Sequence, residues 1–293
     1  MKKYIFLAGV SLFIIACEKN VTVEVPKVEE GIVVEGRIEI DTFPIVFLSR
    51  TLPFFGEINL NQIQSNTITG ATVVVEDGFT VDTLVQIDPG YGIYFGVQMR
   101  GVEGRTYKLT ILVEGKTLTS TTTIPISTKL DSVWWKVNGD RDTLGFAWAH
   151  LTDPDTNGNC FQWYAQRINK YTYGKNIGRQ KDSTFVAGPG SAFEDKFFNN
   201  KSFDFNFARG AFTFSEKEDD NNDERFYFKR GDTIVVKFCS IDRNTFEFWR
   251  TEETQVQNNG NPFGSPAPIS GNIKGGLGIW GGYAASYDTI IAR

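Results

Sequence analysis

The sequence predicts a mostly β protein, in which an N-terminal immunoglobulin-like antiparallel β-sandwich precedes a second β-rich domain with one short helix. Aromatic residues make up 14% of the 293 residues, and phenylalanine alone occurs 25 times. Aromatic and β-branched side chains favour strands. Apolar residues also alternate with polar ones over short runs bounded by turn residues, which is the period of half-buried strands, whereas long helical periods are rare.

The N-terminus predicts a lipoprotein signal peptide over residues 1–16. Lys2 and Lys3 precede a short apolar run that ends in Phe13-Ile14-Ile15-Ala16-Cys17. A positive start, a short apolar core and a small residue before a cysteine are typical of a secretory signal of the lipoprotein type. An uncleaved membrane helix would need about twenty apolar residues, and Glu18-Lys19-Asn20 interrupts the run too early. We therefore expect Cys17 to become the acylated N-terminus of the mature protein.

The rest of the chain is expected to form a tether and two domains. The polar, valine-rich stretch 17–30 shows no strand or helix period and predicts a lipid-anchored tether, followed by the sandwich at 31–126 and the second domain at 127–293. Loss of residues 1–16 removes two lysines and no acid, so the net charge falls from −5 to −7. This negative charge argues against nucleic acid or anionic lipid as a partner. The acyl chains on Cys17 would supply the membrane contact.

Strand patterns in the first domain follow one another closely. Tyr107, Leu109, Ile111 and Val113 alternate with polar residues, and Glu114-Gly115 turns the chain into the next run. The expected strands are Ile32–Ile40, Ile45–Leu48, Gly70–Glu76, Tyr107–Val113 and Thr117–Ile124. Regularly spaced short strands of this kind favour an antiparallel sandwich, and Pro125 with the polar residues after it marks the boundary.

The second domain combines strands with a long loop and one helix. A loop or insertion is expected between Tyr173 and Asn200, because this stretch contains Gly188-Pro189-Gly190. A helix is expected over Asn244–Gln257, stopped by Asn258-Asn259-Gly260. The expected strands are Asp131–Val137, Leu144–His150, Cys160–Tyr173, Phe203–Phe207, Arg225–Lys229 and Thr233–Ser240.

The glycine-rich tail Gly275–Tyr283 carries large apolar residues at alternate positions. This pattern predicts a strand whose backbone approaches another part of the protein closely.

Cys160 and Cys239 are the two cysteines left after Cys17, an even number in an exported protein. In the expected strands each lies on the more polar side, opposite Phe161 or Phe238. Free structural cysteines prefer apolar surroundings, which favours a disulfide over two free thiols here.

Asp153, Asp155 and Asn157 lie in a sequence that starts like a calcium-binding loop. The glutamate expected at the twelfth position is replaced by Tyr164. Because Asp, Asn, Pro and Gly also build ordinary turns, we expect a turn, with no metal and no other cofactor apart from the lipid.

No catalytic residues are assigned, and we do not expect an enzyme. His150 is the sole histidine, and no nucleophile elbow accompanies it. Glycoside hydrolysis by a pair of carboxylates stays an open alternative, because a sequence does not show how far apart two carboxylates lie. The six tryptophans and the phenylalanines of 193–214 are expected to be mainly core, with the remainder available for a sugar platform or a partner surface.

Four sets of short sequence stretches, in this order, give the chain a resemblance to the Bacteroidota outer-membrane lipoprotein family known as domain of unknown function 4249. They are Val33-Val34-Glu35-Gly36 with Leu48-Ser49-Arg50-Thr51, Gly70-Ala71-Thr72-Val73, Gly104-Arg105-Thr106-Tyr107 with Thr121-Thr122-Thr123-Ile124-Pro125, and Asn261-Pro262-Phe263 with Asn272-Ile273-Lys274-Gly275-Gly276-Leu277-Gly278. The resemblance implies a lipoprotein without an established activity, often encoded beside a TonB-dependent transporter. It supplies no catalytic residues.

Together these observations predict a non-catalytic accessory subunit of an outer-membrane β-barrel complex. The barrel would be a TonB-dependent transporter or part of an assembly or export complex. The protein would be lipid-anchored in the outer membrane, on the cell-surface side. An independent surface module that binds glycan or peptide is the alternative.

Overall fold

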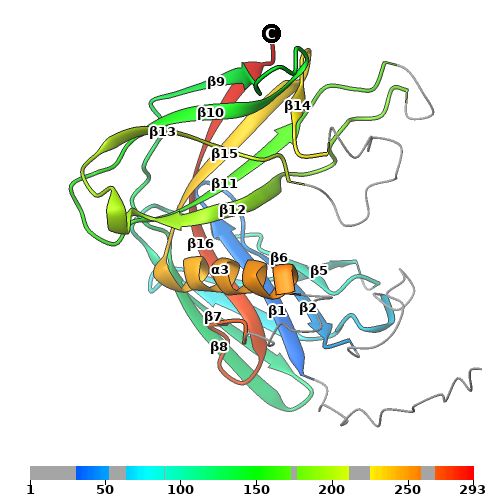
Figure 1. The fold of residues 1–293 in the computed structure, drawn as a ribbon. Coiled ribbons are helices and arrows are strands. Elements are labelled where there is room, and N and C mark those ends of the chain that lie inside the picture. Colours follow the sequence, from blue (N-terminus) through cyan, green and yellow to red (C-terminus); the bar gives the residue numbers. More distant parts are fainter. Residues whose placement is uncertain (1–30, 53–63, 89, 173–176, 211–224, 259–267) are drawn as a thin grey trace, which may run out of the picture. The chain divides into compact units, whose positions relative to one another are not determined.

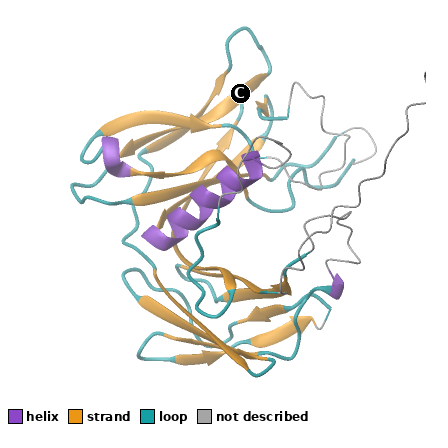
Figure 2. Cartoon of the chain, turned by 60° about the horizontal axis from the view of Figure 1, so that its bottom comes forward, coloured by secondary structure: helices purple, strands orange, loops and turns teal. Residues whose placement is uncertain are grey.

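The computed structural model describes residues 31–52, 64–88, 90–172, 177–210, 225–258 and 268–293, and these residues are mostly β (Figures 1 and 2). Within them, the helix α3 (Arg243–Asn258) and a short 3-10 turn, η2 (Asp195–Phe197), accompany sixteen strands in three sheets. The mostly β class and the single helix near 244–257 are thus confirmed. The predicted signal peptide, Cys17 and the tether lie outside the described residues.

An eight-stranded sheet extends through both halves of the chain. In sheet order its strands are β12 (Val186–Glu194), β11 (Cys160–Arg167), β15 (Thr233–Ile241), β16 (Leu277–Ile291), β1 (Ile32–Glu39), β2 (Ile45–Arg50), β6 (Ile93–Phe95) and β5 (Val85–Asp88).

Two four-stranded sheets complete the fold. The first contains β4 (Val81–Thr83), β3 (Thr72–Glu76), β7 (Thr106–Val113) and β8 (Lys116–Thr123), in this order. The second contains β13 (Ser202–Phe207), β10 (Leu144–Thr152) and β14 (Phe228–Lys229), with β9 (Ser132–Val137) also paired to β10. The strand predicted at Arg225–Lys229 is therefore shorter than expected.

Strand β16 connects the two halves, because it pairs antiparallel with β15 and parallel with β1. Its glycines permit this close pairing. A Cβ on Gly278 would lie 2.0 Å from the carbonyl oxygen of Val34, and one on Gly282 would lie 2.7 Å from that of Thr123. The predicted close backbone approach of this tail is confirmed, whereas its parallel partner was not anticipated in the antiparallel scheme.

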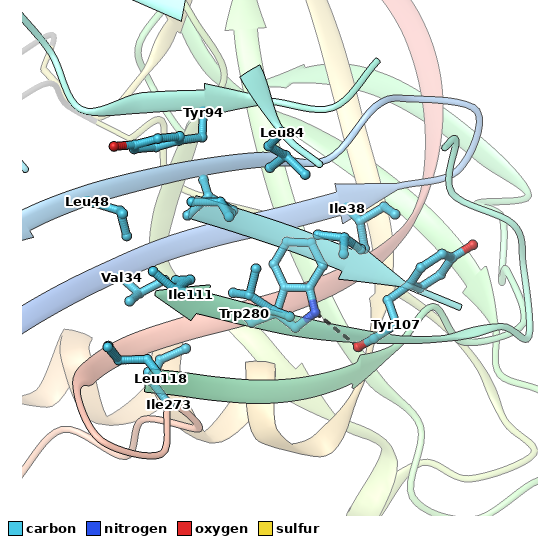
Figure 3. Close-up of a cluster of buried hydrophobic side chains, with 14 of the residues drawn as sticks. Val34, Ile38, Leu48, Leu84, Tyr94, Tyr107, Ile111, Leu118, Ile273 and Trp280 are labelled. Atoms are coloured by element: carbon cyan, nitrogen blue, oxygen red, sulfur yellow. Dashed lines mark hydrogen bonds between the residues drawn. The ribbon is translucent and has the colours of Figure 1, made fainter. Parts of the chain in front are cut away.

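One face of the eight-stranded sheet, here called the back face, carries the cores. Alternate residues of β1 and β16, such as Val34, Ile38 and Trp280, pack against the first four-stranded sheet in a sandwich-like core (Figure 3). The indole of Trp280 is fully buried and donates a hydrogen bond to the carbonyl oxygen of Tyr107 at 3.1 Å. The aliphatic faces predicted for the sandwich strands are thus the core faces.

The second core, on the same back face, is aromatic. Phe161, Trp163 and Phe238 pack there against Phe203 and Phe205 of the second four-stranded sheet. The strict alternation of Phe203–Phe207 therefore marks a strand with one core face, as predicted.

A strand occupies part of the loop that the sequence predicts between Tyr173 and Asn200. β12 pairs with β11, with a register shift between Gln162 and Tyr164. Pro189 fits because β12 is an edge strand and the irregular pairing needs no amide donor there. The long-loop prediction was wrong for residues 186–194.

The expected domain boundary at 126/127 lies between β8 and β9, but the first core also takes in Ile273, Trp280 and Ala284 from beyond it. Residues 31–293 form one compact unit, and β16 contributes to both cores. The division into two domains, 31–126 and 127–293, stays a prediction.

Candidate functional site

The other face of the eight-stranded sheet, here called the front face, is chemically mixed. Glu35, Arg37 and Glu39 of β1 point to it because they alternate with the buried back-face residues Val34, Gly36 and Ile38. The pairing register places Tyr283 beside Glu39, Tyr287 beside Lys237, and Lys237 beside Tyr164. A row of polar and aromatic side chains thus crosses four neighbouring strands.

Helix α3 covers part of this face. Phe246 packs against Cys160, Cys239, Ile241 and Tyr283 in a small apolar cluster. Asp242 begins the helix: its Oδ1 accepts the Thr245 N–H at 2.8 Å, and its Oδ2 accepts the Thr122 hydroxyl at 2.6 Å. The N-cap carboxylate therefore also ties α3 to strand β8.

A pocket of about 360 Å³ lies beside the helix on the front face. Its lining combines aromatic, aliphatic and charged side chains. They are Glu35, Gly36, Arg37, Glu39, Phe47, Tyr164, Thr184, Phe185, Val186, Ala187, Lys237, Trp249, Ile279 and Tyr283. A concave, largely apolar site with a few convergent polar groups is the usual form of a ligand-binding pocket.

A buried ion pair lies in this pocket. Lys237 Nζ is 2.5 Å from Glu39 Oε1, and each side chain is 10% exposed. Tyr287 donates its hydroxyl to Glu39 Oε2 at 3.4 Å, and Arg37 Nε lies 3.7 Å from Glu39 Oε1. Such a pair persists in a partly apolar site because each ion compensates the other.

The pocket tyrosines are held protonated. Burial raises the pKa of Tyr283, whose hydroxyl accepts a hydrogen bond from Trp249 Nε1 at 2.9 Å. Burial also raises the pKa of Tyr164 well above its usual value, with further upward contributions from Tyr283, Cys239 and Glu39. At neutral pH these hydroxyl groups can shape and hydrogen-bond a ligand, and they are poorly suited to accept its protons.

The family of the chain follows from its sequence. Residues 18–288 match the family model described as "Domain of unknown function (DUF4249)". The chain belongs to the DUF4249 family. No curated protein matches the sequence.

In this DUF4249 member, Cys160 and Cys239 are both buried free thiols. Cys160 lies opposite Ile241, and Cys239 lies opposite Gln162, so the two cysteines are diagonal neighbours on β11 and β15. Diagonal positions are usually farther apart than a disulfide requires. Helix α3 also covers the side of the strands that the sequence suggested was polar. The two cysteines are therefore not in the polar surroundings that favoured a disulfide. The disulfide itself stays a prediction.

The segment that contains Asp153, Asp155 and Asn157 forms a turn, and a carboxylate from another part of the chain binds its backbone. Asp195 Oδ2 accepts the N–H groups of Gly158 and Asn159, both at 2.9 Å. Asp153 is buried, whereas Asp155 and Asn157 are exposed. Burial raises the pKa of Asp153, and the charge of Asp195 acts in the same direction. In the described ranges, no group of three or more His, Cys, Asp or Glu side chains is arranged to hold a metal ion.

His150 lies on the solvent-facing side of β10, where its Nδ1 is 2.6 Å from Asp204 Oδ1. It lies outside the pocket lining. In the part of the chain that the structure describes, no helix has the length and apolar character needed to cross a membrane.

Sequence reasoning missed the ion pair of this DUF4249 member. Glu39 and Lys237 are 198 positions apart. Two local signals could have suggested them: charged residues at every second position of β1, and a lysine inside the apolar run Ile234–Phe238. Neither signal says that the two side chains meet.

Proposed function

We propose that this chain is a lipid-anchored outer-membrane lipoprotein that acts as a non-catalytic accessory subunit of an outer-membrane β-barrel complex. The barrel would be a TonB-dependent transporter, with assembly or export of outer-membrane proteins as a variant. The lipoprotein sequence ending at Cys17 supports the anchor, and the DUF4249 match covers the chain that follows it. The protein would stand on the cell-surface side.

The front-face pocket carries the proposal of a binding role. Lys237 is held by Glu39, and the raised pKa values of Tyr164 and Tyr283 keep their hydroxyl groups protonated. These groups can hydrogen-bond a bound molecule and fix its position. We therefore infer that the pocket holds a ligand, and we propose that the subunit presents or retains this ligand without transforming it.

Purification from native membranes tests the accessory role. A tagged full-length chain should retain a stoichiometric β-barrel partner after detergent extraction. Cys17→Ala should leave the membrane fraction and lose most of this partner, because the anchor confines both proteins to one membrane. A wild-type protein that is unacylated, or that purifies alone under mild conditions, would contradict the accessory role.

The pocket also favours a second candidate, an independent surface module for glycan or peptide. Its concave shape and aromatic lining are those of a pocket that would bind a ligand without another subunit. A solitary, acylated protein that retains a ligand would support this alternative over the accessory role.

A further inference from the structure

We propose that the front-face pocket binds a neutral saccharide of one or two rings. This inference rests on the proposed binding role of the same pocket and goes beyond it by naming the ligand class. It follows from three properties of the lining: which aromatic rings are open, how the charges balance, and which hydrogen-bonding groups are unused.

Phe47 on β2 and Trp249 on α3 are two aromatic residues of the lining that are at least partly exposed. The Lys237 ammonium lies over the rings of Tyr164 and Phe185, with its Nζ 5.4 and 5.7 Å from their centroids. Tyr283 is buried, whereas Phe47 is 37% exposed and Trp249 is partly exposed. Phe47 and Trp249 can therefore contact the apolar C–H face of a sugar ring from a strand and a helix.

The charges of the lining balance. Two acids, Glu35 and Glu39, are matched by two bases, Arg37 and Lys237. An organic cation, which open aromatic rings could also attract, would meet the Lys237 and Arg37 charges, and an anion would meet those of Glu35 and Glu39. A neutral ligand avoids both penalties.

The hydrogen-bonding groups suit hydroxyl groups. Each sugar hydroxyl can donate and accept, so it fits a site that offers both functions side by side. Glu35 and Arg37 are exposed neighbours on the front face of β1, one a pure acceptor and the other a pure donor. Lys237 has N–H groups beyond the one that Glu39 accepts.

Calorimetric titration of the purified full-length protein tests the proposal. Maltose, cellobiose, lactose and chitobiose are the neutral probes, and choline and glucuronate are the charged ones. The detergent must carry no sugar head group, since an alkyl maltoside would compete. We expect at least one neutral disaccharide to bind more tightly than either charged probe. Trp249→Ala should weaken this binding about tenfold through the lost ring contact, and Arg37→Ala should also weaken it.

Trp134→Ala is the matched control. Trp134 is likewise partly exposed, but it stacks on Trp148 on the second four-stranded sheet, with ring centroids 6.4 Å apart. Its loss should leave saccharide binding unchanged. Thermal unfolding would verify that each variant is folded, and the exposed Arg37 provides a test if Trp249→Ala is not.

Three results would overturn the proposal: none of the four disaccharides binds, a charged probe binds more tightly, or saccharide binding is unchanged in both folded pocket variants. None of these results concerns the barrel partner, which is measured by co-purification. Failure of the saccharide proposal is thus distinguishable from failure of the accessory role.

Discussion

The two faces of the eight-stranded sheet are made from the same strands and differ in what covers them. The back face packs against two other sheets and carries the two large apolar cores. The front face is covered in part by α3 and keeps a pocket with a buried ion pair. Because neighbouring residues of a strand point to opposite faces, strands such as β1 and β16 place one set of side chains in the core and the other set in the pocket lining.

The largest expected effect is on the back face. Trp280→Ala removes a fully buried indole and its hydrogen bond to Tyr107, and should lower the free energy of unfolding by about 3–5 kcal/mol. Urea denaturation of the purified protein would measure the loss. Trp134→Ala, at a partly exposed position, should cost clearly less. Equal losses would contradict the assignment of the back face as the main source of stability.

The front-face ion pair should give the next largest effect. Lys237→Met leaves the Glu39 carboxylate buried without its partner, which should cost about 3 kcal/mol. Adding Glu39→Leu should recover part of this loss, because it removes the uncompensated charge. Arg37→Ala, at an exposed neighbouring position, should change stability by less than about 0.5 kcal/mol. If Lys237→Met leaves the free energy of unfolding unchanged, the pair is not buried as described.

The sequence also predicts the residues of the two faces with different success. Periodicity identifies well the residues that form the cores against the back face, as in Tyr107–Val113 and Phe203–Phe207 of the two four-stranded sheets, because burial on one side requires apolar residues at every second position. The helix and the close approach of Gly275–Tyr283 were predictable from turn residues and glycines. These are local properties of the chain.

The front-face site depends on which strands pair, and periodicity does not specify a partner. The parallel pairing of β1 with β16 places Tyr283 beside Glu39, although 244 positions separate them in the sequence. The pocket therefore exists only after pairings between distant segments. For the same reason, the polar side predicted for Cys160 and Cys239 gave no hint that α3 covers it.

A smaller effect is expected where the helix that covers the front face is attached to β8. Asp242→Ala removes the N-cap of α3 and the acceptor of the Thr122 hydroxyl, and should cost about 1–2 kcal/mol. Asp242→Asn, which keeps a side-chain oxygen able to cap Thr245, should cost less. Thermal unfolding of the two variants would measure both losses. An equally stable Asp242→Ala variant would show that the other contacts of the helix, such as the packing of Phe246 and the Trp249–Tyr283 hydrogen bond, hold it without the cap.

The smallest effect concerns the thiols beneath α3 and appears only at alkaline pH. Burial raises the pKa of Cys239 from 9.0 to about 12. The stability contributed by the protonated thiol is therefore present below pH 9 and is lost as the pH rises toward 12. Between pH 8 and pH 10 the wild-type protein should lose about 1 kcal/mol more than Cys239→Ala. Urea denaturation at the two pH values would measure this difference.

The same measurement decides whether Cys239 is bridged to Cys160. A disulfide has no proton to lose, so a bridged protein would show no such alkaline loss. Its mass under non-reducing conditions would also be two hydrogens lower than after reduction. Free thiols, as in the structure, should instead resist alkylation at pH 8 until urea unfolds the protein, because burial also raises the pKa of Cys160, to about 11.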